Sequence, residues 1–154
     1  MSEDKNSPPL TPEKKKQLRD AIIVEDKKLH GIKYEYGAEW TDYSKPPETL
    51  DCSEKIEGEF KIAGLFIPDG AQAQYNFTQP TETPQPGDLV FFGKSRDINQ
   101  IYHVGLVFDE ENISEARGFQ PDSSFETGKV ILRPRKAWEA YKNFVGYRTH
   151  PKLA

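Results

Sequence analysis

The 154-residue chain contains one cysteine, one methionine and no long apolar run. A single cysteine excludes an internal disulfide and any zinc site that needs several cysteines. No apolar stretch reaches the roughly 20 residues of a membrane-spanning helix. The N-terminal sequence MSEDKNSPPL also lacks the basic start and the apolar core of a signal peptide. We therefore expect synthesis in the cytoplasm, no membrane insertion and a fold that rests on its hydrophobic core.

The chain also has no excess of positive charge, because 21 Lys and Arg residues against 25 Asp and Glu residues leave a net charge of -4. Proteins that bind nucleic acid usually present a clustered basic surface, so we expect no nucleic-acid partner. The composition, 35% hydrophobic and 30% charged, is that of a folded globular protein. The length suits one domain, which we place at residues 11–150 behind a flexible polar tail at residues 1–10.

Helical periodicity marks two segments in the first half of the chain. A Thr-Pro pair forms a typical helix start, and apolar residues at helical spacing predict a helix over residues 12–29. Residues 31–50 hold several aromatic side chains among Gly and Pro, which is typical of a loop. A second amphipathic helix is predicted to begin at Cys52 and to end near Gly64.

Short runs of β-branched and aromatic residues dominate the second half of the chain. They predict five strands and one short helix. The strands are expected at residues 89–92, 102–108, 113–116, 129–132 and 144–148, and the helix at 136–141. The acidic turn at residues 109–112 lacks the spaced oxygen ligands of a calcium loop, so we expect no metal there. Short turns favour antiparallel pairing, and we expect an α+β fold with helices packed on a largely antiparallel sheet.

The single cysteine stands where the second helix is predicted to start. The positive end of a helix dipole favours the thiolate, which is the nucleophilic form of cysteine. Its neighbours Asp51 and Ser53 are good helix-start residues and poor core residues, so Cys52 lies at the boundary of an element. The alternative reading of a lone cysteine is a small buried hydrophobic side chain.

A thiol nucleophile needs a base, and the chain offers three histidines. His30 lies at a helix end and His150 in the C-terminal tail, where a surface or capping role is the default. His103 lies inside an apolar strand, where a histidine costs desolvation unless it is paired. His103 is therefore the candidate base, and a hydrogen-bonded core histidine is the alternative.

Glu115 offers the acceptor that would orient this base. It lies on the strand predicted to pair with the strand of His103, and cross-strand neighbours bring side chains to within about 5 Å. A carboxylate in that position can accept a hydrogen bond from the imidazole, as a catalytic triad requires. A strand carboxylate that faces solvent is the alternative.

Several segments around these residues resemble the motifs of the NlpC family of cell-wall peptidases, a papain-like group. They are, in order, residues 31–37 (GIKYEYG), 51–53 (DCS), 86–92 (PGDLVFF) and 103–107 (HVGLV), and residues 144–148 (FVGYR) resemble the last strand of the family. The resemblance covers residues 31–148. Each segment alone is a weak signal, and the ordered set is more specific.

The resemblance implies a small papain-like core with the cysteine helix against the sheet. It implies Cys52 as nucleophile, His103 as general base and Glu115 as third polar residue. Further residues are implied to shape the oxyanion or substrate site, namely Tyr34, Asp51, Ser53 and Trp40. It implies hydrolysis of muropeptide bonds in bacterial peptidoglycan, often between D-glutamate and a diamino acid, with no metal and no other cofactor.

The sequence departs from the family pattern at three places. The third catalytic position is commonly histidine, where this chain has Glu115, and Glu54 stands where glycine is usual. The loop at residues 37–50 is longer than in compact members, and its Trp40 and Tyr43 are expected to influence substrate choice. An N-acetylmuramoyl-alanine amidase, an acyltransferase with the same dyad and an inactive wall-binding or phage structural module remain alternatives. Without a signal peptide, delivery to the wall by a phage particle or a secretion apparatus is expected.

Overall fold

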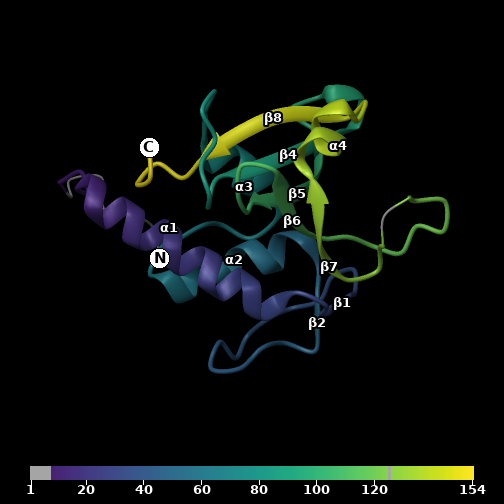
Figure 1. Cartoon of the computed structure of the whole chain (residues 1–154), viewed down its shortest axis with the longest axis horizontal. Helices are drawn as coiled ribbons and strands as arrows, with labels where there is room; N and C mark the ends of the chain where they lie inside the picture. Colours follow the sequence, from purple (N-terminus) through teal and green to yellow (C-terminus); the bar gives the residue numbers. More distant parts are fainter. Residues whose placement is uncertain (1–7, 125) are drawn as a thin grey trace.

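A six-stranded antiparallel sheet forms the centre of the computed structural model, which describes residues 8–124 and 126–154 (Figure 1). The strands lie in the order β3-β8-β4-β5-β6-β7. Their bounds are Gln79–Pro80 for β3, Leu89–Gly93 for β4, Ile101–Val107 for β5, Asn112–Ala116 for β6, Val130–Pro134 for β7 and Phe144–Thr149 for β8. The predicted α+β fold with a largely antiparallel sheet is confirmed.

Helices cover both faces of this sheet. The long α1 (Pro12–Leu29) and the cysteine helix α2 (Cys52–Ala63) lie together on one side, as Figure 1 shows. The short α3 (Ala71–Phe77) packs on the same side against β5, and α4 (Arg135–Ala140) packs on the opposite side. The helices predicted at residues 12–29 and from Cys52 onward are confirmed.

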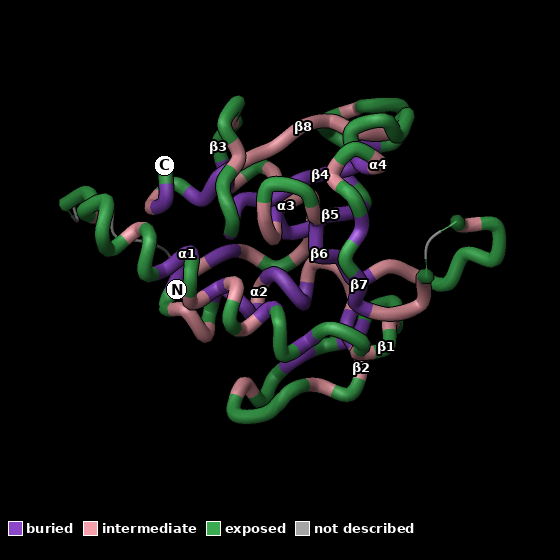
Figure 2. Tube along the Cα trace, in the orientation of Figure 1, coloured by how far each residue is buried: buried purple, intermediate pink, exposed green. Residues whose placement is uncertain are grey.

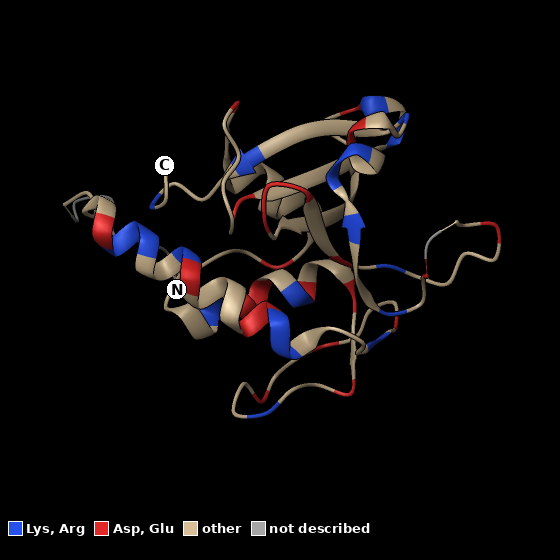
Figure 3. Cartoon of the chain, viewed as in Figure 1, with Lys and Arg blue, Asp and Glu red and all other residues tan. Residues whose placement is uncertain are grey.

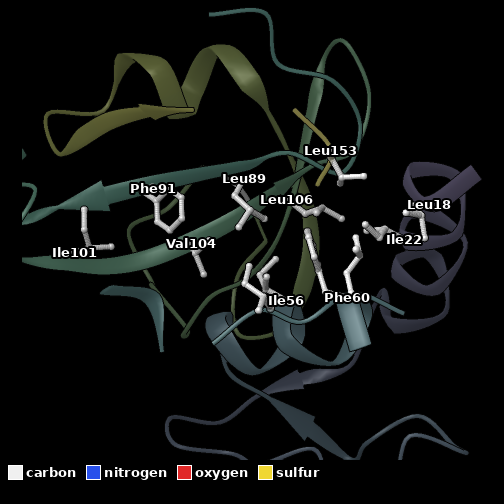
Figure 4. Close-up of a cluster of buried hydrophobic side chains, with 12 residues drawn as sticks. Leu18, Ile22, Ile56, Phe60, Leu89, Phe91, Ile101, Val104, Leu106 and Leu153 are labelled. Atoms are coloured by element: carbon white, nitrogen blue, oxygen red, sulfur yellow. The ribbon is translucent and has the colours of Figure 1, made fainter. Parts of the chain in front are cut away.

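Side chains of β4 alternate between the two faces of the sheet, and both faces are covered, which explains why all residues of this strand are apolar. Leu89 and Phe91 point to the core under α1 and α2, which Figure 4 shows. Val90 and Phe92 point to the other face and pack on Trp138 of α4. Both faces of the strand are therefore buried, and the purple sheet centre of Figure 2 shows the same.

Two local features differ from the sequence prediction. The aromatic segment at residues 31–50 contains two short strands, β1 (Lys33–Tyr34) and β2 (Thr49–Leu50), which pair in parallel. The helix α3 and the edge strand β3 were also not predicted. These elements are too short for a periodic pattern, and their pairing depends on contacts between distant residues.

The ends of the described chain contribute to the core. Leu10 and Leu153 pack on it from just outside the predicted domain limits, while residues 1–7 of the predicted tail lie outside the described residues. The surface role predicted for His150 is wrong, because this side chain is fully buried and donates from Nε2 to the Phe66 carbonyl at 2.6 Å. No helix within the described ranges is long and apolar enough to cross a membrane.

Candidate active site

Cys52 is the first residue of α2, as the sequence predicts. Asp51 caps the helix, because its Oδ1 accepts a hydrogen bond from the backbone N–H of Glu54 at 2.8 Å. The thiol is partly exposed at the positive end of the helix dipole. Cys52 is therefore not a fully buried hydrophobic residue, and its role as nucleophile stays a prediction.

A buried ionic cluster fixes α2 against both α1 and the sheet. Lys55, one turn after Cys52, places its Nζ 2.5 Å from Asp26 Oδ2 and 3.0 Å from Glu59 Oε1. Ser114 on β6 donates to the same Asp26 oxygen at 2.9 Å. Burial opposes ionisation of Asp26, but the Lys55 ammonium holds the pKa of this carboxyl well below its usual range. The cluster thereby sets the position of the cysteine helix relative to β6, which carries Glu115 next to Ser114.

His103 lies on β5 with its ring buried and stacked on Trp138, the ring centroids being 5.3 Å apart. Its Nε2 lies 3.1 Å from Glu115 Oε1. Burial by itself would lower the pKa of His103, but the nearby Cys52 and Glu115 side chains raise it to about 9. The ring is thus stabilised as an imidazolium.

Glu115 on β6 is fully buried, so the reading as a solvent-facing carboxylate is wrong. Besides His103 it contacts three residues that the sequence analysis did not identify, one through a hydrogen bond and two through ion pairs. Trp138 Nε1 donates to Oε2 at 2.6 Å, Arg117 Nε lies 2.6 Å from Oε1 and Arg133 Nε lies 3.2 Å from Oε2. Burial would raise the pKa of Glu115, but His103 and the two guanidinium groups lower it to about 2. The carboxylate is therefore ionised and held in one orientation.

The signals for these three residues differ in strength. Arg117 stands two residues after Glu115, just past the end of β6, so continued strand alternation places both side chains on one face. Arg133 reaches Glu115 from β7, which pairs with β6, and Trp138 reaches it from α4. Only the first of these three neighbours could have been found from sequence spacing.

Tyr34 is brought to the cysteine by the small strand β1. Its backbone N–H donates to the Gly128 carbonyl at 2.9 Å, which joins β1 to the segment before β7. Burial, followed by the negative charges of Cys52 and Asp51, raises the pKa of the Tyr34 phenol to about 12. Tyr34 pairs with Leu50, two residues before Cys52, and its phenol stays a hydrogen-bond donor at neutral pH.

The remaining predicted site residues separate into two groups. Asp51 and Ser53 flank the thiol, and the Ser53 hydroxyl lies 3.4 Å from Asp51 Oδ1. Trp40 is only 4% exposed and packs against Gly58, where a Cβ would lie 2.1 Å from Trp40 Cε3. Its backbone N–H donates to Glu54 Oε1 at 2.8 Å. The structure gives Trp40 a packing role that anchors the loop at residues 37–50 to α2, and its contact with substrate stays a prediction.

One acidic group within the described chain has the spacing of metal ligands. Glu54, Glu57 and Asp69 each offer an oxygen within 4.8 Å of the others. Burial, with the charge of Glu54 next, raises the pKa of Glu57 to about 7. The raised pKa of Glu57 favours its protonated form, which reduces the repulsion within this group without a cation.

Comparisons of the sequence and of the fold with known proteins point to the same family. The profile of the NlpC/P60 family matches residues 31–131. The bifunctional muramidase/DL-endopeptidase CwlT of Bacillus subtilis is 33% identical over 89 residues, which make up 56% of this chain and 26% of CwlT. The probable endopeptidase p60 of Listeria grayi is 38% identical over 88 residues, or 56% of this chain and 16% of that protein. The match thus spans about a quarter or less of these relatives.

Solved structures show the same fold. The peptidoglycan hydrolase RipB of Mycobacterium tuberculosis superposes with a TM-score of 0.68 at 22% identity, covering 92% of this chain and 68% of RipB. An NlpC/P60 family protein from Bacillus cereus gives a TM-score of 0.70 at 19% identity, covering 93% of this chain and 41% of that one. The family profile covers well over half of the sequence and the papain-like fold extends over nearly all of it, so the chain belongs to the NlpC/P60 family.

Proposed function

We propose that this chain is a cysteine peptidase that hydrolyses amide bonds in the stem peptides of bacterial peptidoglycan. The observation that carries the proposal is the position of His103, whose ring is hydrogen-bonded to the Glu115 carboxylate and interacts with the Cys52 side chain at the start of α2. A nucleophile, a base and an orienting acceptor in this order are the parts of a catalytic triad. The names of the endopeptidases and hydrolases that match the chain support the same reaction class.

The reaction proceeds through an acyl-thioester. The Cys52 thiolate attacks the carbonyl carbon, a C–S bond forms and the carbonyl oxygen takes up the negative charge. When this intermediate collapses, the C–N bond breaks and the His103 imidazolium gives its proton to the departing amine. The neutral imidazole then takes a proton from water as the water attacks the thioester, and Cys52 leaves as a thiolate. Glu115 holds the ring in orientation throughout and stabilises its charged form.

The developing oxyanion needs donors on the side of Cys52. The backbone N–H groups at the start of α2 are available because a helix leaves its first N–H groups without partners inside the helix. The Tyr34 phenol, which remains protonated, supplies a second donor near the thiol. Both belong to rigid elements, so they are oriented before the substrate binds.

The bond between D-glutamate and the diamino acid is the proposed cleavage site. A DL-endopeptidase and a gamma-DL-glutamyl hydrolase of Bacillus subtilis are among the relatives, and the latter is 27% identical over 131 residues. Half-buried Asp51 and Ser53, which flank the thiol, are proposed to contact the substrate. Delivery to the wall by a phage particle or a secretion apparatus also remains a proposal.

Digestion of purified peptidoglycan, followed by mass spectrometry of the released fragments, tests this function. We expect wild type to release stem-peptide fragments and Cys52→Ala to release none, while Gln17→Ala on the exposed face of α1 serves as an active control. The masses identify the bond, because an amidase would release the whole stem peptide from the glycan. A family member that only binds the wall would release nothing from walls of several chemistries while both proteins remain folded. Such a binder would also keep its affinity for the wall after Cys52→Ala.

A further inference from the structure

The turn between β4 and β5 has an unfavourable backbone. Ser95 has φ 53° and ψ 32°, and Arg96 has φ 62°. Together with the hydrogen bond from Asp97 N to the Lys94 carbonyl, these angles are those of a type I′ turn, which favours Asn-Gly. Ser95 and Arg96 are the only residues other than glycine with positive φ in the described ranges. Strained backbone of this kind is often retained where its side chains have a function.

Contacts with the segment between α4 and β8 hold this turn in place. The Ser95 backbone N–H donates to Asn143 Oδ1 at 3.2 Å, and Arg96 Nε donates to the Lys142 carbonyl at 3.1 Å. Asn143 Nδ2 donates in turn to the hydroxyl of Tyr102, which precedes His103 on β5. The contacts bring basic residues from two distant parts of the sequence together at one end of the sheet, near the start of the strand that carries His103.

Three cations line a single cavity at this place. Lys94, Arg96 and Lys142, with Ser95 and Asn143, surround a volume of about 440 Å³. Figure 3 shows basic residues gathered near the end of α4 and the start of β8. None of the three cations forms an ion pair with a carboxylate of the described residues. The positive charge is concentrated here although the whole chain has a net charge of -4.

Asp97, the residue after Arg96, forms no ion pair with this cluster. The Asp97 carboxylate accepts from the Asn99 backbone N–H at 2.8 Å and from Gln100 Nε2 at 2.9 Å. Both bonds stay within its own turn. The three cations therefore remain available to an external anion.

The lining residues identify the chemistry of that anion. A guanidinium and two ammonium groups are typical partners of phosphate oxygens. The lining contains no large apolar side chain, as insertion into a bilayer would need, and no aromatic ring on which a nucleic-acid base could stack. The cavity exceeds by far the about 30 Å³ that one water occupies, so it has room for more than one phosphate group. We propose that this basic turn site binds a polymer with repeated phosphodiester groups.

The site would hold the protein on such a polymer independently of amide hydrolysis. Binding of fluorescently labelled poly(glycerol phosphate), measured by anisotropy at 50 mM and 200 mM NaCl, tests the proposal. The site variant combines Lys94→Gln, Arg96→Gln and Lys142→Gln. The control variant changes net charge equally at exposed lysines elsewhere, with Lys14→Gln, Lys27→Gln and Lys45→Gln.

We expect the site variant to lose at least about tenfold in affinity and the control variant less than about threefold, because contacts in the cavity outweigh net charge. Raising NaCl from 50 mM to 200 mM should weaken wild-type binding by about twentyfold, because three cations release their counterions. Arg96→Gly adds a second readout, since glycine suits the positive φ: we expect a higher Tm together with weaker binding. Cys52→Ala should bind as wild type does, which separates this proposal from the proposed peptidase.

Several results would overturn the proposal. Equal losses of affinity in the two triple variants would mean that net charge alone explains the binding. Inorganic phosphate that competes as well as the polymer at equal phosphate concentration would indicate a site for a single ion. Binding to vesicles of anionic lipid without binding to the polymer would indicate a membrane surface, and no binding at 50 mM NaCl would refute the site.

Discussion

Replacing Glu115 by glutamine tests how strongly the site and the fold depend on one buried carboxylate. The change keeps the shape of the side chain and removes the negative charge that contacts His103, Arg117 and Arg133. Removing one partner of a buried ion pair costs about 3–5 kcal/mol, because the charges that remain are buried without compensation. We expect the free energy of unfolding at pH 7 to fall by about this amount.

The loss of folding stability in Glu115→Gln should also depend on pH, because the Glu115 carboxylate titrates. The pKa of Glu115 is about 2 in the folded chain and ordinarily 4.5. A carboxyl with a depressed folded pKa stabilises the protein above its unfolded pKa and loses this effect as the pH falls through the folded value. This linkage corresponds to about 3 kcal/mol at pH 7 and about 1 kcal/mol at pH 3. The stability difference between wild type and Glu115→Gln should therefore shrink by about 2 kcal/mol between these pH values.

Urea unfolding followed by tryptophan fluorescence at pH 7 and pH 3 measures both effects. The matched control is Glu126→Gln, which removes the same charge from an exposed pair with Lys129, where the Glu126 side chain is 71% exposed. An exposed pair contributes less than about 1 kcal/mol, so this variant should stay close to wild type. A Glu115→Gln variant no less stable than the control, or a difference that stays constant with pH, would refute the reasoning.

Two further substitutions probe the surroundings of the site. Trp138→Phe keeps a ring beside His103 but removes the 2.6 Å hydrogen bond to Glu115. It should therefore lower the free energy of unfolding by about 1.5–3 kcal/mol and reduce kcat more than it changes KM. An unchanged kcat would show that the indole does not position the carboxylate. Gly58→Ala would place a Cβ 2.1 Å from the Trp40 ring, and the overpacking should cost about 1–3 kcal/mol and alter the near-UV circular dichroism. A Tm equal to that of wild type would contradict this packing.

Much of the fold was predictable because its signals are local. The helix caps of α1 and α2 are formed by residues within three positions of each helix start. Apolar spacing then gives the helices, and continuous apolar runs give β4 and β5. The small strands β1 and β2 escaped prediction because they are two residues each and lie on either side of a long loop.

The candidate triad was predictable for a related reason. Cys52 stands at a helix start, His103 is an unusual residue for an apolar strand, and Glu115 lies on the next strand along the chain. Each of these positions follows from secondary structure and short connections. A sequence pattern does not show whether these three side chains contact one another. Only the structure shows these interactions, on which a catalytic role depends.

The sequence by itself determined the element order, the position of the single thiol at a helix start and the membership of His103 and Glu115 in neighbouring strands. Only the tertiary structure decided that Trp138 and two arginines hold the Glu115 carboxylate and that Trp40 packs a loop against α2. It also brought Lys142 to the turn at Lys94 and Arg96, nearly 50 residues away in sequence. The physical reason is that periodicity and caps report interactions over a few residues, whereas these contacts arise when distant segments pack around one core.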